Sequence, residues 1–233
     1  MKRRFFFLMM LILSGNATAN IVINGTRLIY HEENDSITVQ LNNNSQTSSL
    51  AQSWTDDGDI NATPENSSSP FYVYPPIVKI DGMQGQQLKI KKNNEKLPDD
   101  RESVFYLSVL DIPATPANAK GKSVLQVALR SRIKLFYRPA GLTANPETVI
   151  DNIQWKLNGD HLSVTNNSPY HFTIAAVNAN DSSHTWLAAS EMIPPFSEKQ
   201  LPLKNKPAAR NASVTYVDDY GVYKSRILPS DGR

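Results

Sequence analysis

The longest run of strict alternation in the sequence, residues 123–139, most constrains how this chain can fold. Six of the seven odd positions from 125 to 137 are apolar or aromatic, whereas the even positions between them include Gln126, Arg130, Arg132 and Lys134. A period of two is the signature of a β-strand with one apolar face. Because a mean strand has about 5–6 residues, these residues predict an unusually long strand.

The polar side of this strand can be interpreted in two ways. Arg130, Arg132, Lys134 and Arg138 occupy alternate positions and could form the solvated face of an ordinary sandwich strand. Alternatively, the strand could be offered to another protein through its apolar side. The residues of the strand alone leave both interpretations open.

The rest of the chain predicts an all-β protein. Short runs of apolar alternation are separated by turn residues at intervals typical of β-sandwiches, and no window has a convincing helical period. Residues 56–69 and 113–122 read as loops, and residues 139–145 read as a linker. We therefore expect two consecutive β-sandwich domains, residues 20–138 and 139–233. The predicted strands besides 123–139 are residues 21–30, 36–41, 50–55, 71–74, 77–80, 87–91, 104–110, 153–157, 161–164, 170–177, 185–188, 198–203, 213–217 and 222–228.

The first 19 residues have the pattern of a secretory signal peptide. A basic start at Lys2, Arg3 and Arg4 precedes a short apolar run and ends in Ala17-Thr18-Ala19. Cleavage would take these three basic residues from the total of 24, leaving 21 against 22 acidic residues, a net charge of −1. We therefore expect a soluble exported protein that binds no nucleic acid. Because the chain has no cysteine, its stability should rest on its cores.

No motif of an enzyme or of a metal site is present in the sequence. It lacks the nucleophile, zinc-protease, phosphate-loop and dinucleotide signatures, and its four histidines have no metal-ligand spacing. The acidic pairs Asp99-Asp100 and Asp218-Asp219 are typical of solvated turns. We expect no catalytic residue, no cofactor and no metal.

Several motifs together closely resemble the periplasmic pilus-assembly chaperones of the chaperone–usher pathway. The most specific are the Leu97–Tyr106 block L-P-D-D-R-E-S-V-F-Y and the Arg132–Pro139 block R-I-K-L-F-Y-R-P. Supporting motifs, in chain order, are T-R-L-I-Y at 26–30, Q-S-W at 52–54, L-Q-V-A at 125–128, N-S-P-Y at 167–170 and D-D-Y-G at 218–221. The likeness covers the whole chain after the predicted signal peptide.

The resemblance implies two immunoglobulin-like sandwiches at an angle, with a cleft between them that binds subunits. It also implies donor-strand complementation, in which the chaperone lends a strand to a pilus subunit that lacks its last one. Leu125, Val127 and Leu129 would be the inserted side chains. The implied partners are pilus subunits and an outer-membrane usher, without membrane insertion, and an unbound donor strand could allow self-association.

The resemblance assigns further roles to charged residues. Arg27 and Lys134 would anchor the C-terminal carboxylate of the pilus subunit, and Glu102, Arg138 and Asp219 would form ion pairs between the domains. The short connection at 113–122 and the absence of cysteine resemble the short-loop subclass, which is associated with rod-like pili.

An adhesin or carbohydrate-binding module built on two sandwiches is the alternative function. Such a module binds sugars through exposed aromatic side chains, and Trp155, Trp186 and Tyr223 are the candidates. Packing within a core or an interface is the other explanation for these three residues.

Overall fold

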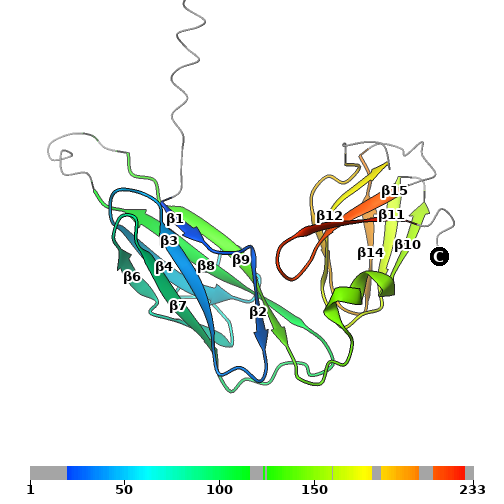
Figure 1. Cartoon of the computed structure of the whole chain (residues 1–233), viewed down its shortest axis with the longest axis horizontal. Coiled ribbons are helices and arrows are strands. Elements are labelled where there is room, and N and C mark those ends of the chain that lie inside the picture. Colours follow the sequence, from blue (N-terminus) through cyan, green and yellow to red (C-terminus); the bar gives the residue numbers. More distant parts are fainter. Residues whose placement is uncertain are drawn as a thin grey trace, which may run out of the picture.

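The structure is a computed structural model that describes residues 20–115, 123, 125–158, 160–179, 185–204 and 212–228. The expected signal peptide lies outside these residues, as do residues 116–122 of the predicted loop. Strands dominate the described chain and form two domains (Figure 1). No helix in the described ranges is both long and apolar enough to cross a membrane.

The first domain is a sandwich of a four-stranded and a five-stranded sheet. The four-stranded sheet has the order β1 (Ile21–Ile23), β3 (Ile37–Asn43), β7 (Gly85–Lys92) and β5 (Phe71–Tyr74). The five-stranded sheet has the order β2 (Arg27–His31), β9 (Leu129–Arg138), β8 (Ser103–Pro113), β4 (Ser49–Asp56) and β6 (Ile77–Ile80). Leu41 and Leu88 of one sheet and Leu107 and Leu135 of the other are fully buried in a common core.

The predicted first strand, residues 21–30, is divided between the two sheets. β1 pairs with β3, whereas β2 pairs in parallel with β9. The chain changes sheets through Asn24, Gly25 and Thr26, where Gly25 has a φ of 106°. Glycine adopts this backbone conformation without steric cost, so the switch places Arg27 at the edge of the five-stranded sheet.

The predicted strand at 123–139 is wrong in its first part. β9 begins at Leu129, opposite Asp111 near the end of β8, and residues 125–128 form no strand. Alternation shows which side chains share a face, but a strand also needs a hydrogen-bonding neighbour. Among the described residues, none pairs with 125–128.

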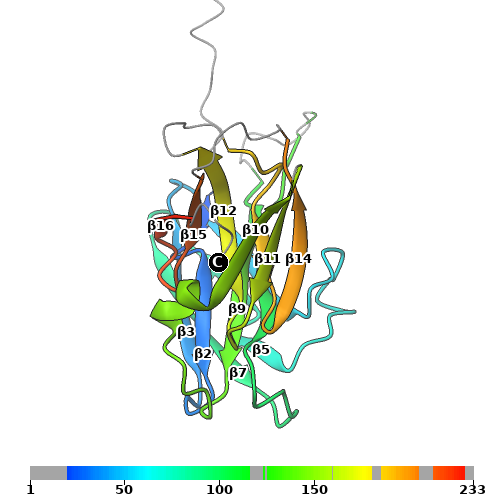
Figure 2. The ribbon, with the colours of Figure 1, turned by 90° about the vertical axis from the view of Figure 1, so that its right-hand side faces the viewer.

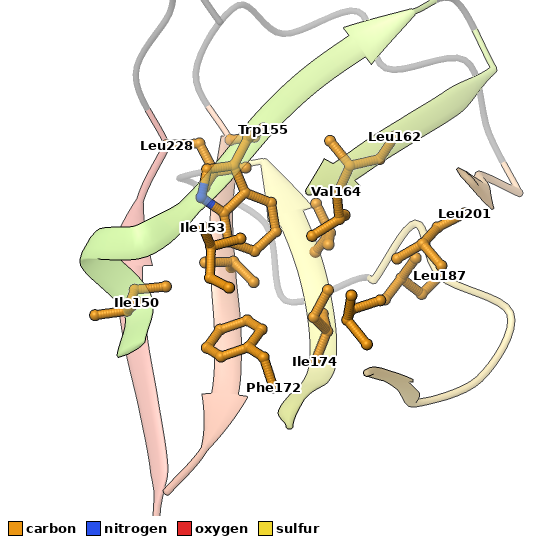
Figure 3. Packing of buried hydrophobic residues seen from close by; sticks show 14 of the residues in the cluster. Ile150, Ile153, Trp155, Leu162, Val164, Phe172, Ile174, Leu187, Leu201 and Leu228 are labelled. Carbon is orange, nitrogen blue, oxygen red and sulfur yellow. The ribbon is translucent and has the colours of Figure 1, made fainter. Parts of the chain in front are cut away.

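The second domain packs two smaller sheets around its own core. One has the order β10 (Ile153–Asn158), β11 (His161–Asn166) and β14 (Ser197–Pro202), and the other β13 (Glu191–Ile193), β12 (Phe172–Ala179), β15 (Ala212–Val217) and β16 (Tyr223–Ile227). The core contains Trp155, Val164 and Phe172 (Figure 3). A strand predicted at 185–188 is wrong, because Thr185 and Leu187 form only isolated bridges.

A short 3-10 helix, η3 (Pro146–Asn152), follows the linker between the domains and was not predicted. Asn145 caps it by accepting a hydrogen bond from the Glu147 amide at 2.9 Å, and Pro146 occupies the first turn. Val149 and Ile150 are buried in the second core. Figure 2 shows the second domain in front, with η3 at the start of β10.

Candidate functional site

The three predicted donor side chains are exposed at alternate positions, two of them on the unpaired residues 125–128 and the third at the first residue of β9. Leu125, Val127 and Leu129 are 88%, 57% and 45% exposed. Farther along the same side of β9, Ile133 packs against the core and Leu135 is buried within it. The donor positions therefore share the odd-numbered alternation of the core residues of β9, beyond the last residue of β8 that pairs with β9.

Arg27 and Lys134 are brought together at the edge of the cleft. They are partners in the parallel pairing of β2 with β9. The Arg27 Nη1 donates to the Val217 carbonyl oxygen at 3.3 Å, and the Lys134 Nζ lies 3.4 Å from the Thr173 hydroxyl. Both cations thus reach the second domain from adjacent strands of the first.

Burial and mutual repulsion disfavour the charged forms of these two cations. Burial lowers the pKa of Lys134, and the neighbouring Arg27 charge lowers it further. Burial also lowers the pKa of Arg27, against the opposing effect of Asp219 and other anionic groups. The Arg27 Nε is buried and has no hydrogen-bond partner among the described residues. An anion placed between the two side chains would relieve their repulsion.

Arg138, at the end of β9, links the two domains. Its Nε donates to Glu102 Oε1 at 2.9 Å, and its Nη1 and Nη2 donate to the two oxygens of Asp219 at 2.6 and 2.7 Å. Burial disfavours the charged guanidinium, but the carboxylates of Asp219 and Glu102 more than offset this and raise the pKa of Arg138. The three predicted ion-pair residues therefore form one contact network.

Glu102 also reaches the second domain through a residue that the sequence motifs did not single out. Its Oε2 accepts a hydrogen bond from the His171 amide at 2.9 Å and lies 2.9 Å from His171 Nδ1. The Glu102 amide donates to the Pro169 carbonyl at 2.8 Å. The motif N-S-P-Y at 167–170 was the only available signal, since His171 follows it directly.

The turn between β15 and β16 completes the contact between the domains. Asp218 Oδ1 accepts from the Tyr220 and Val222 amides at 3.0 and 2.9 Å, which shapes the turn that presents Asp219. Gly221 has a φ of 80°, and a Cβ at this position would lie 2.5 Å from the Thr26 hydroxyl oxygen. Figure 1 shows this hairpin projecting toward the first domain.

A cavity of about 290 Å³ lies where these elements meet. Its lining includes Arg27, Phe136, Arg138, His171 and Tyr216. Lys134 is not part of the lining, so the cavity adjoins the pair of cations rather than enclosing it.

Comparison with known protein families identifies the family of this chain. The family described as "Pili and flagellar-assembly chaperone, PapD N-terminal domain" matches residues 20–143, and "Pili assembly chaperone PapD, C-terminal domain" matches residues 148–227. The chain belongs to the PapD family of pilus-assembly chaperones. Its members are chaperones rather than enzymes, and its fimbrial chaperones are periplasmic.

Individual PapD-family relatives match nearly the whole chain. The probable fimbrial chaperone YehC of Escherichia coli K12 is 42% identical over 209 residues, covering 90% of this chain and 86% of YehC. The chaperone FimB/FhaD of Bordetella pertussis is 36% identical over 218 residues, covering 91% and 89%. The solved CupB2 chaperone of Pseudomonas aeruginosa has a TM-score of 0.74 at 30% identity, covering 88% and 98%.

The sugar-binding alternative loses two of its three aromatic candidates in this PapD-family fold. Trp155 and Trp186 are buried in the core of the second domain. Tyr223 is 70% exposed on β16. Because a sugar-binding platform needs exposed rings, the two tryptophans serve packing instead.

Proposed function

We propose that this protein captures pilus subunits by donating residues 125–129 to a subunit that lacks its last strand. The exposure of Leu125 and Val127 on an unpaired segment, and of Leu129 where this segment enters β9, carries this proposal. Apolar side chains of this size normally lie in a core. Burying each of them in the groove of a subunit would contribute about 1.5–3 kcal/mol.

Arg27 and Lys134 would hold the C-terminal carboxylate of the pilus subunit in the cleft. A carboxylate accepts charge-assisted hydrogen bonds from both cations, each worth about 1.5–3 kcal/mol. A fixed terminus also sets the register of the bound strand. A shift of one residue would direct the pocket-filling side chains to the wrong face.

The contacts of Glu102, Arg138 and Asp219 would hold the two domains at the angle that forms the cleft.

In this proposal the chain is exported by the signal peptide at 1–19, and its domains are residues 20–138 and 139–233. It carries no catalytic site. It delivers subunits to an outer-membrane usher, and we assign it to the short-loop subclass because its connection at 113–122 is short.

The substitution Leu129→Glu tests this function directly. We expect the variant to fold, because Leu129 is 45% exposed in the free protein. It should fail to protect a fimbrial subunit from proteolysis in the periplasm, since an ionised side chain cannot enter an apolar groove without a large cost. Ile227→Glu is the matched control, because Ile227 is an exposed aliphatic residue on β16.

The proposal fails if Leu129→Glu protects subunits as well as the wild type and Ile227→Glu do. If Leu129→Glu unfolds the free protein instead, Leu129 serves its own domain and not a partner. Thermal unfolding of each purified variant separates these two outcomes.

A further inference from the structure

Three even-numbered polar residues, Gln126 on the donor segment and Arg130 and Arg132 in β9, attach this part of the chain to the first domain. The Gln126 side-chain amide donates to the Pro113 carbonyl at the end of β8. The Arg130 guanidinium donates to the Ala62 carbonyl at 3.2 Å and to the Ile60 carbonyl. Arg132 forms a two-point ion pair with Asp56, one contact of which joins Nε to Oδ2 at 3.2 Å.

Aromatic rings fix the two guanidinium groups from the side of the sheet. Arg130 lies over the Trp54 ring at 5.8 Å from its centroid, and Arg132 lies over the Tyr106 ring at 3.6 Å. A planar guanidinium can stack on a ring and donate hydrogen bonds at its edge simultaneously. Arg130 is therefore held between its own sheet and the loop that follows β4, and Arg132 is held at Asp56, the last residue of β4, from which this loop starts.

This loop offers its acceptors in a defined geometry. Asp56 is buried and its Oδ1 also accepts a hydrogen bond from the Gly58 amide at 3.0 Å. The carbonyls of Ile60 and Ala62 lie farther along the same turn, and the Ala62 side chain is buried. Two arginines of the basic row thus make specific contacts, Arg132 with Asp56 and Arg130 with the loop that follows it.

The attachments alternate with the exposed donor side chains. Gln126 and Arg130 are even-numbered and bound to the domain, whereas Leu125, Val127 and Leu129 are odd-numbered and exposed. Rotation of the segment about its axis would break the even-numbered contacts. Residues 125–128 have no strand partner among the described residues, whereas Leu129 and Arg130 already pair with β8. The Gln126 contact therefore restricts the unpaired part of the segment, and the Arg130 contacts hold its junction with β9.

We propose that Gln126, Arg130 and Arg132 are positioning residues that present the donor side chains in one orientation before a pilus subunit arrives. The inference rests on the proposed donor-strand function and extends it to the opposite face of the segment. Ordering a free segment costs conformational entropy, which weakens binding unless the segment is ordered in advance. Releasing the attachments should lower the competent fraction of molecules and weaken capture in proportion.

Arg130→Gln is the sharpest test, because Arg130 is exposed and its loss leaves no buried charge behind. Arg132 is less suitable, since its removal would strand the buried Asp56 carboxylate and destabilise the domain. Arg226→Gln is the matched control: Arg226 is also exposed and pairs with Asp151 in the second domain. Arg130→Lys keeps a charged donor, and Gln126→Ala removes a neighbouring attachment.

Two measurements are needed for each variant. The chain has no cysteine, so Ala128→Cys accepts a single spin label whose mobility reports the order of the segment. The second measurement is the rate at which the protein captures a urea-unfolded fimbrial subunit that the wild type captures on dilution. Thermal unfolding of the same samples monitors stability.

We expect Arg130→Gln to increase label mobility and to slow capture about tenfold, with an unchanged melting temperature. Gln126→Ala should act in the same direction, Arg130→Lys should recover part of the loss, and Arg226→Gln should match the wild type. Unchanged mobility and capture in Arg130→Gln and Gln126→Ala would overturn the inference, provided that Leu129→Glu still abolishes capture. If Leu129→Glu also captures normally, the donor-strand function itself fails, and the positioning role with it.

Discussion

At the scale of single residues, the cleft holds two cations in an unfavourable state. Lys134 and Arg27 lie on adjacent strands, and burial lowers the pKa of each. A lysine whose pKa is lower in the folded than in the unfolded chain destabilises the fold wherever it is charged. Such a cost is expected where a site must remain ready for an anion.

Replacing Lys134 with methionine should therefore separate stability from function. Lys134→Met keeps the length of the side chain but removes its charge, so the free protein should be at least as stable as the wild type. Any gain in the free energy of unfolding over the wild type should be present at neutral pH. It should shrink as the pH approaches the ordinary lysine pKa of 10.5, because the wild-type lysine then loses its charge in both the folded and the unfolded chain.

The same substitution should weaken binding of a peptide that ends like a fimbrial subunit at least tenfold, about 1.4 kcal/mol. Amidating the C-terminus of this peptide should reproduce most of the loss in the wild type and little of it in Lys134→Met. Titration calorimetry of both peptides against both proteins gives the four affinities. Equal affinities for the acid and amide peptides would rule out a carboxylate anchor at Lys134.

Capture of a carboxylate should also be linked to proton uptake at alkaline pH. The bound anion favours the charged lysine and raises the pKa that burial and Arg27 lower in the free protein. Between these two pKa values binding takes up a proton, so affinity should fall as the pH rises through the free-state value. Calorimetry in buffers of different ionisation enthalpy measures this uptake, which Lys134→Met should lack.

At the scale of elements, the β15–β16 hairpin depends on one glycine for its docking. Gly221 combines a φ of 80° with a close approach to Thr26 in the first domain. A side chain at position 221 would strain the backbone, and it would also clash with the Thr26 side chain across the interface. Within the four residues of the motif D-D-Y-G, Asp218 shapes the turn, Asp219 pairs with Arg138, and Gly221 allows the close contact with Thr26.

Gly221→Ala should destabilise the protein by more than the about 1–2 kcal/mol of the left-handed backbone alone. In a Thr26→Ala background, the part of this destabilisation that comes from the clash should disappear, because the Thr26 hydroxyl oxygen is the nearest atom. The part that comes from the strained backbone should remain. Thermal unfolding of the single and double variants gives the coupling.

Gly141→Ala is the control for this prediction. A Cβ there would have no neighbour closer than 3.8 Å, so its effect should stay within about 0.5 kcal/mol. If Gly221→Ala behaves like Gly141→Ala, the hairpin is not packed against Thr26 in solution.

At the scale of the whole molecule, charged groups in a small area connect the two domains. Arg138 binds Glu102 of its own domain and Asp219 of the other, and Glu102 binds His171. Glu102 and Arg138 are both buried. A buried ion pair specifies geometry more reliably than it adds stability, because desolvation offsets much of its attraction.

Asp219→Asn should widen the range of domain angles and cost about 1–3 kcal/mol, since Arg138 then lacks a charged partner across the interface. Small-angle scattering should show a broader distance distribution. Asp81→Asn is the control, because Asp81 pairs with Lys79 at 3.0 Å on an exposed surface within one domain. Identical scattering and melting curves for the two variants would show that the ion pairs do not set the angle.

The sequence by itself determined the properties that depend on residues close together along the chain. Alternation at 125–137 showed which side chains share a face, and the spacing of apolar runs indicated an all-β chain. These properties follow from the two-residue period of a strand, which needs no knowledge of the partner. Arg27, Lys134 and Arg138 became candidate site residues through motifs and through the resemblance to the pilus-assembly chaperones.

Only the tertiary structure decided which of these residues meet, and where a strand ends. β9 begins at Leu129, opposite Asp111, and residues 125–128 pair with no strand among the described residues, although the alternation extends through them. His171 reaches Glu102, and Arg130 reaches Ile60, across 69 and 70 positions of sequence. Such contacts are set by sheet order and by the packing of one domain on the other, which have no local period for a sequence to display.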